Sequence, residues 1–164
     1  MLKCRYESEK EKYVKDRDKS LLEIKDRQEI LIEKVKYEVL NMTKFREKSS
    51  YWIEYKIRRL EDNKMFYLNV ELSSKAILYE IIENTIIELK MNISFQGDEY
   101  ELYEKGTGKV ETYYGMTDVG LNEEVSYYEY QKKRDGKNFL SIEKWKDETE
   151  VSLGRLISLS DIRY

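Results

Sequence analysis

The sequence predicts an all-β, mainly antiparallel fold: two pseudo-repeated meanders packed as a sandwich or a partly open barrel. Three observations support this fold class. β-Branched and aromatic residues, including 15 Tyr in the whole chain, dominate from Ser20 onward. The chain has no Pro, and its Gly residues stand at predicted turns. Finally, two hairpin-like segments, 50–72 and 126–145, repeat one pattern of aromatic, Glu-Tyr, charged turn and Leu-x-x-Glu.

The chain has the length of one domain, with 164 residues. Residues 1–19 alternate basic and acidic side chains and contain few apolar ones, which predicts a short charged helix or arm. Residues 20–164 are expected to form a single β domain made of two repeats, about 28–90 and 91–164.

Short runs rich in β-branched and aromatic residues, bounded by turn residues, indicate where the strands lie. One segment is ambiguous: 76–90 has an apolar spacing that suits a helix and a strand equally well. The predicted strands span 28–33, 36–46, 51–59, 64–72, 99–104, 109–115, 124–133, 137–145 and 149–153.

Residues directly opposite in an antiparallel pair share a face, so the apolar positions fix the register of each hairpin. The first hairpin is predicted to close with a four-residue loop, 60–63, and the second with a three-residue loop, 134–136, containing a type I turn and a left-handed Gly136. The predicted apolar pairs are Ile53 with Val70, Tyr55 with Leu68, Ile57 with Phe66, Tyr128 with Ile142, and Tyr130 with Leu140.

The opposite faces of the two hairpins then carry the same roles. An aromatic residue lies opposite a Glu, and a Glu lies opposite a small polar residue. Upstream, VKYEVLNM at 35–42 parallels DEYELYEK at 98–105, so the repeat covers about half of the chain and predicts a duplication. The four pairs are Trp52 with Glu71, Glu54 with Asn69, Tyr127 with Glu143, and Glu129 with Ser141.

The chain contains the motifs Trp52-x-Glu54-Tyr55, Leu68-x-Val70-Glu71, GDEYELYEKGTGKVE (97–111), YYEY (127–130), FLSIEKW (139–145) and EVSLG (150–154). Over about residues 28–164, these motifs resemble a bacterial family known as domain of unknown function 4178. The resemblance departs at the charged N-terminal arm and at 76–90, where the family is usually strand-like and shorter. It implies no activity. Members are often encoded near phage-shock protein A-like and other membrane-stress proteins, which implies an accessory role there.

The repeated carboxylates and rings form the candidate binding groove. Carboxylates beside aromatic rings could hold a cation, a polyamine or a lysine-rich peptide. The alternative is structural: such carboxylates accept backbone N–H groups, pair with Lys or Arg, or protect strand edges from aggregation. The candidate residues are Trp52, Glu54, Glu71, Tyr127, Glu129, Glu143 and Trp145.

The absence of His excludes His-dependent nucleophilic catalysis and His-ligated zinc, and the single cysteine, Cys4, cannot form an intrachain disulfide. No Asp-x-Asp-x-Asp-Gly calcium loop occurs, so neither a metal nor another cofactor is predicted. Gly106-x-Gly108 lacks the spacing of a phosphate-binding loop and is predicted to be a hairpin turn.

The sequence therefore predicts a non-catalytic, cytoplasmic module for protein interaction or small-ligand recognition, an accessory in membrane or envelope stress. A net charge of −3 and the lack of a long apolar stretch predict neither nucleic-acid binding nor membrane insertion. A protein partner and a homodimer through sheet edges are expected. Two alternatives stay open: a carboxylate-dependent hydrolase, and a single-stranded nucleic-acid binder that stacks bases on Tyr113-Tyr114 and Tyr127-Tyr128.

Overall fold

A computed structural model describes residues 24–71 and 75–164. The predicted charged arm at 1–19 lies outside the described residues. The described residues form one antiparallel β-sheet of eleven strands. They also contain one short 3-10 helix and no α-helix. The predicted all-β antiparallel class is confirmed.

Each half of the described chain is a five-stranded meander in which consecutive strands pair. The short strand β11 then pairs with β1. The first half contains β1 (Glu29–Ile32), β2 (Val35–Glu47), β3 (Ser50–Arg59), β4 (Met65–Glu71) and β5 (Ala76–Ile82). The second contains β6 (Asn92–Phe95), β7 (Asp98–Gly115), β8 (Glu124–Lys132), β9 (Asn138–Lys144) and β10 (Thr149–Ile157), followed by the 3-10 helix η1 (Leu159–Asp161) and β11 (Ile162–Arg163).

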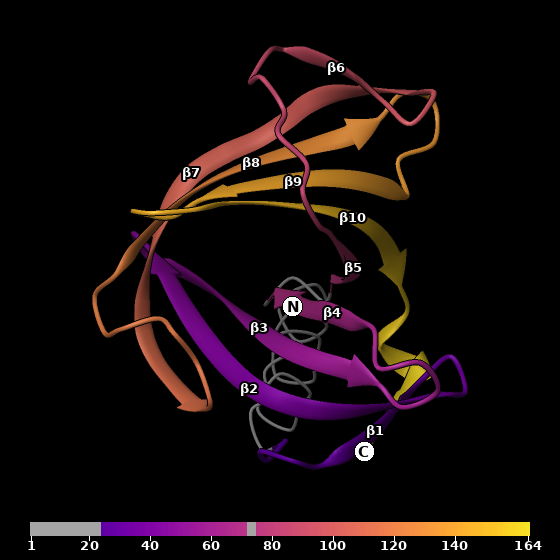
Figure 1. Cartoon of the computed structure of the whole chain (residues 1–164), viewed down its shortest axis with the longest axis vertical. Coiled ribbons are helices and arrows are strands. Elements are labelled where there is room, and N and C mark those ends of the chain that lie inside the picture. Colours follow the sequence, from indigo (N-terminus) through magenta and orange to yellow (C-terminus); the bar gives the residue numbers. More distant parts are fainter. Residues whose placement is uncertain (1–23, 72–74) are drawn as a thin grey trace, which may run out of the picture.

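The two meanders close into an eight-stranded barrel, because β2 pairs with β7 and β5 pairs with β10. Figure 1 shows them as two curved layers, β7–β10 and β2–β4, that meet at the long strands β2 and β7. The predicted sandwich or partly open barrel is wrong. The reason is strand length: β2 pairs with β1 over 35–38 and with β7 over 41–46, so one strand serves both the meander and the closure.

Closure leaves β6 and β11, of four and two residues, as the end strands of the sheet order. The predicted dimer through sheet edges would therefore have to use these short strands. The matching order of β1–β5 and β6–β10 is the order that a duplication would produce. A common origin of the halves stays a prediction.

The register of both hairpins is as predicted, including the pairs Trp52 with Glu71 and Tyr127 with Glu143. The four-residue loop 60–63 is confirmed, since the Arg59 amide donates to the Lys64 carbonyl across its base. In the second loop Gly136 has the expected positive φ of 62°, but Arg134 also has a positive φ, 68°, so the predicted type I turn is wrong.

The ambiguous segment 76–90 is a strand only as far as Ile82, so the helical interpretation is wrong, and β6 was not predicted. Periodicity fails here because β5 is buried on both faces. On one face Ala76 and Leu78 pack in the same apolar cluster as Leu68, while on the other face Ile77 and Tyr79 pack with Phe139. Such a strand shows no alternation.

Apolar side chains gather mainly on the outer faces of the barrel strands. The larger cluster joins the outer face of β2–β5 to β1 and β11, through residues such as Tyr55, Leu68 and Ile30. A second cluster joins the outer face of β8–β10 to β6 and the start of β7, through Leu140, Ile142 and Ile93 among others. The inner face is consequently free to carry polar groups.

Gly106 and Gly108 lie in the middle of β7, so the predicted hairpin turn is wrong and the two strands predicted at 99–104 and 109–115 are one. Both glycines give space to rings inside the barrel. A Cβ on Gly108 would overlap the indole of Trp52, and one on Gly106 would overlap Tyr127 and Glu47. The GxG pattern thus reflects packing, and not phosphate binding or a turn.

We expect Gly108→Ala to lower the free energy of unfolding by about 1–3 kcal/mol, the usual cost of overpacking. Gly120→Ala is the matched control, because its Cβ would meet nothing closer than Glu123 Oε2 at 3.9 Å. Chemical denaturation of both variants checks this. Equal stability of Gly108→Ala and the unmodified protein would contradict the packing described for Trp52.

Candidate functional site

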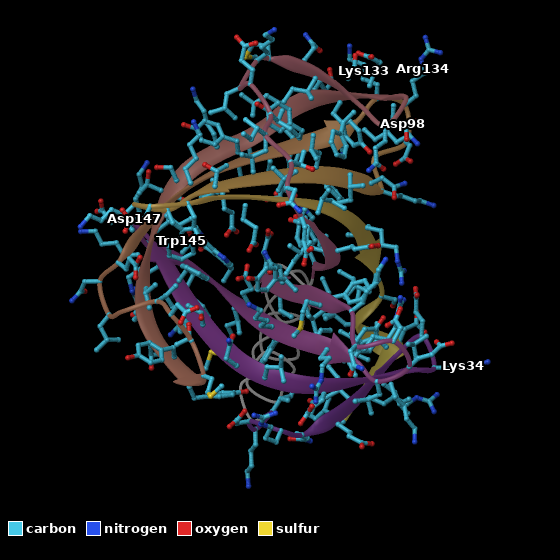
Figure 2. The ribbon with its side chains drawn as sticks, in the orientation of Figure 1. Lys34, Asp98, Lys133, Arg134, Trp145 and Asp147 are labelled. Atoms are coloured by element: carbon cyan, nitrogen blue, oxygen red, sulfur yellow. The ribbon has the colours of Figure 1, made fainter. Side chains whose placement is uncertain are left out.

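Two of the cavities that described residues line lie inside the barrel. The wide cavity, of about 600 Å³, lies between β2–β4 and β9–β10 and reaches the β9–β10 turn; Figure 2 labels Trp145 and Asp147 at that end. The narrow cavity, of about 60 Å³, adjoins it at Glu143, which lines both. The wide cavity is lined by Asn41, Thr43, Phe45, Glu54, Lys56, Tyr67, 115–119, Glu143, Trp145, Glu148 and Glu150. The narrow cavity is lined by Trp52, Asn69, Glu71, Lys75, Ile77, Tyr79, Glu104, Tyr127, Glu129, Ser141 and Glu143.

All seven candidate residues from the sequence line these cavities. Glu54, Glu143 and Trp145 line the wide cavity, and Trp52, Glu71, Tyr127, Glu129 and Glu143 line the narrow one. Strand alternation explains this arrangement for the six residues within strands, and Trp145 continues the alternation one residue past β9. The edge-protecting interpretation is wrong, since β3, β4, β8 and β9 each have a neighbour on both sides.

Tyrosine hydroxyl groups donate to carboxylates across the interior. Tyr79 on β5 donates to Glu129 on β8. Tyr67 on β4 donates to Glu150 on β10 at 3.2 Å, and Tyr127 on β8 donates to Glu47 on β2 at 2.6 Å. These bonds link strands that are not neighbours in the ring. They fix the carboxyl groups in place without supplying a positive charge.

The carboxyl groups inside the barrel differ from those outside in their ion pairs. On the outer surface Glu111 pairs with Lys44 at 2.8 Å, and Asp98 pairs with Lys132 at 2.9 Å. None of the ion pairs between described residues involves Glu54, Glu71, Glu129, Glu143 or Glu150. The positively charged residues that line the two cavities, among those described, are Lys56 and Lys75.

Burial therefore keeps protons on several of these groups. Burial, with the Glu150 charge as the next cause, raises the pKa of Glu143 to about 8. Glu143 and Glu150 lie directly opposite each other on neighbouring strands, where like charges repel. Glu54 is only 7% exposed. Burial and the Glu143 charge raise the pKa of its carboxyl well above the ordinary value. Burial also raises the pKa of Glu129 to about 7.

Aromatic rings complete the lining. Phe45 and Trp52 stack with ring centroids 4.9 Å apart, and the edge of Tyr127 meets Trp52 at 5.5 Å. At the narrow cavity, the Lys75 ammonium lies 4.7 Å from the centre of the Phe139 ring and 5.4 Å from that of Tyr103. The protein thus already places one alkylammonium group against rings beside the buried carboxyl groups.

Several interior residues were missed from the sequence: Lys56, Tyr67, Lys75, Tyr79 and Glu150. For Tyr67 and Glu150, the predicted strand register contained a signal that they face the interior. Tyr67 lies opposite Lys56 in the hairpin whose register was predicted, and Glu150 lies opposite Glu143 across the short β9–β10 turn. Extending the same parity argument by two residues along the first hairpin would have found Tyr67, and extending it by one strand past the second hairpin would have found Glu150. Tyr79 and Lys75 belong to the segment or its boundary where periodicity fails.

The paired tyrosines do not form one stacking surface for nucleic-acid bases. Tyr127 points into the barrel, whereas Tyr128 packs against the outer cluster of β8–β10. Tyr114 packs against the larger outer cluster and donates to the Ile24 carbonyl, while Tyr113 is 40% exposed. Neighbouring rings thus point to opposite sides of their strand.

Residues 24–71 and 75–164 present neither a metal-binding cluster nor a membrane-spanning helix. No group of three or more His, Cys, Asp or Glu side chains is arranged to hold a metal ion. No helix in these ranges has the length and apolar character needed to cross a bilayer.

Residues 28–159 match the model of a protein family described as Domain of unknown function (DUF4178), which confirms the resemblance seen in the sequence. No curated protein and no solved structure matches the chain.

The raised pKa of Glu143 predicts how stability depends on pH. A carboxyl whose pKa is higher in the folded state binds more protons there, so its contribution to stability is lost as pH rises from about 4.5 to about 8. We expect Tm to fall between pH 5.5 and pH 8.5. Glu143→Gln, which resembles the protonated form, should raise Tm at pH 8.5 by several degrees, since 1 kcal/mol corresponds to about 2–4 °C in a chain of this size.

Calorimetric scans at the two pH values measure this effect. Glu61→Gln is the control, because Glu61 is exposed in the 60–63 loop and should leave the pH dependence unchanged. If Glu143→Gln showed the same loss of Tm with pH as the unmodified protein, Glu143 would not carry a raised pKa.

Proposed function

The chain belongs to the family described as Domain of unknown function (DUF4178), a membership that assigns no activity, and we propose that its barrel binds a small organic cation in the wide cavity. One observation carries the proposal: Glu54, Glu143 and Glu150 face this cavity without an ion pair to any described residue. This develops the non-catalytic recognition role predicted from the sequence. The cation would be held by charge and by the rings of Phe45, Tyr67 and Trp145.

The physical argument is one of compensation. Burial deprives Glu54 and Glu143 of the water that stabilises their charged forms, so both tend to keep a proton. A cation that enters supplies the missing positive charge and favours the ionised form. Lys56 provides part of this charge already, because it lowers the pKa of Glu54 and Glu150, yet both values stay raised. The interior can therefore accept further positive charge.

The cavities favour a small ligand over a protein partner. The carboxyl groups lie inside a closed ring of eight strands, where a folded partner could insert only a side chain. Aromatic rings distributed among the carboxyl groups suit an organic cation, because alkylammonium groups bind both.

Butylamine is a suitable first probe, because its ammonium group stays charged over the working pH range. We expect saturable binding whose affinity rises by up to about tenfold per pH unit between pH 6 and pH 8. The reason is that each bound cation must displace a proton from a carboxyl such as Glu143. Trp52 and Trp145 are the two Trp of the chain, and both line the cavities, so intrinsic fluorescence reports binding.

Glu54→Gln and Glu143→Gln should each weaken butylamine binding at pH 8 about tenfold or more, the usual cost of losing a charged partner in a buried site. Glu61→Gln should bind as the unmodified protein does, and butanol, which has no charge, should not bind. Isothermal titration in buffers of different ionisation enthalpy measures the released proton. Equal binding of butanol and butylamine would refute recognition of charge.

A carboxylate-dependent hydrolase is the second candidate. The observation that favours it is the pair Glu143 and Glu150, because a carboxyl with a pKa of about 8 keeps its proton at neutral pH and can act as a general acid beside a second carboxylate. A cavity of about 600 Å³ also has room for a sugar ring.

Nitrophenyl glycosides test the hydrolase directly. Turnover by the unmodified protein that Glu143→Gln abolishes, with Glu61→Gln unaffected, would favour the hydrolase over simple recognition. Absence of turnover across a panel of sugars would remove this candidate and leave cation binding.

A further inference from the structure

We infer that the ligand is a linear diamine or a longer polyamine, with one ammonium group in the wide cavity and the next in the narrow cavity. This rests on the proposed function, which concerns the wide cavity alone. The juxtaposition of the two cavities at Glu143, with a separate pair of carboxyl groups beyond it, points to a ligand with two charges.

The strand register sets the distance between the two groups of carboxyls. Glu54 lies opposite Asn69, so Glu71 is its diagonal neighbour. Glu129 lies opposite Ser141, so Glu143 is likewise diagonal to it. Diagonal positions are roughly 7–8 Å apart. With single bonds of about 1.5 Å, this is the span of an alkyl chain of about four to six carbons between two nitrogens.

The narrow cavity fits a chain and excludes a ring. Its volume of about 60 Å³ is that of a few water-sized spheres. The rings of Trp52, Tyr79 and Tyr127 line it beside Glu71 and Glu129, so methylene groups would contact the rings and an ammonium group would contact the carboxyl groups. A bulky or aromatic cation could enter only the wide cavity.

Asn69 supplies an independent sign of a missing donor. Its Oδ1 atom is buried and has no hydrogen-bond partner, although the Asn69 side chain also forms a hydrogen bond with Glu54. Asn69 lines the narrow cavity. A buried acceptor without a donor is unfavourable, and an ammonium group at this place would donate to it.

Lys75 lines the narrow cavity and places its ammonium group against two rings of the neighbouring pocket. Its ammonium group lies over the rings of Phe139 and Tyr103, and its charge lowers the pKa of Glu71 and Glu129. Burial nevertheless raises the pKa of both groups above their ordinary value. The charge of Lys75 is thus insufficient for the carboxyl groups around it, which leaves a place for the second ammonium of a ligand that enters from the wide cavity.

The test compares diamines of three to eight carbons with butylamine on the full chain at pH 8, by isothermal titration. We expect the best diamine to bind at least tenfold more tightly than butylamine, with an optimum at four to six carbons. Glu71→Gln and Glu129→Gln should each reduce diamine affinity toward that of butylamine. Butylamine affinity should stay as it was, because it uses the wide cavity. Glu61→Gln is again the control.

Each possible outcome of these titrations either supports or overturns the inference. Binding of butylamine and diamines with equal affinity would overturn this inference and leave the proposed function standing. Binding of neither would overturn both. Tight diamine binding that survives both substitutions would place the second ammonium outside the narrow cavity and overturn the inference. Because Glu129 accepts a hydrogen bond from Tyr79, Glu129→Gln is the variant that puts folding at risk. If Glu129→Gln does not fold, Glu71→Gln tests the same conclusion, since the Glu71 carboxyl does not accept that bond.

Discussion

Closure of the ring is the constraint on which the other features depend. The pairings of β2 with β7 and of β5 with β10 turn two meanders into one barrel, and strand alternation then divides every side chain between an inside and an outside. Without these two seams, Glu54 and Glu143 would lie on open sheets and be solvated. With them, carboxyl groups from separate hairpins face a common enclosed space, where their charges interact strongly.

The barrel separates stability from recognition by face. The outer faces carry the large apolar clusters, which include Tyr55, Leu68 and Leu140. Their burial provides most of the hydrophobic stabilisation, because the inner face carries only smaller apolar clusters beside its polar groups. The inner face carries groups that cost free energy when buried alone, such as Glu143, and the hydroxyl groups of Tyr67 and Tyr79 hold some of these in place. Hydrophobic packing on the outer faces therefore offsets the free-energy cost of burying the carboxyl groups of the site.

The sequence allowed much of this arrangement to be predicted, because period-two patterns report which residues share a face. The pairs Trp52 with Glu71 and Tyr127 with Glu143 followed directly. Alternation along a strand does not show whether a face lies inside a closed barrel or on an open sheet, because the pairings that close the barrel join strands far apart in the chain. It also fails for β5, which is buried on both sides, and for Gly108, where a missing side chain reflects a ring that arrives from another strand.

The seams between the halves carry a consequence for how the chain could be divided. Strands β2 and β5 of the first meander pair with β7 and β10 of the second. The segment between β5 and β6 takes part in none of the strand pairings of the barrel. A cut in that connection would leave both ladders intact. Two separate fragments should therefore recognise each other through complementary backbone edges and reconstitute the whole, as a noncovalent heterodimer, with the acidic chamber restored at their common boundary.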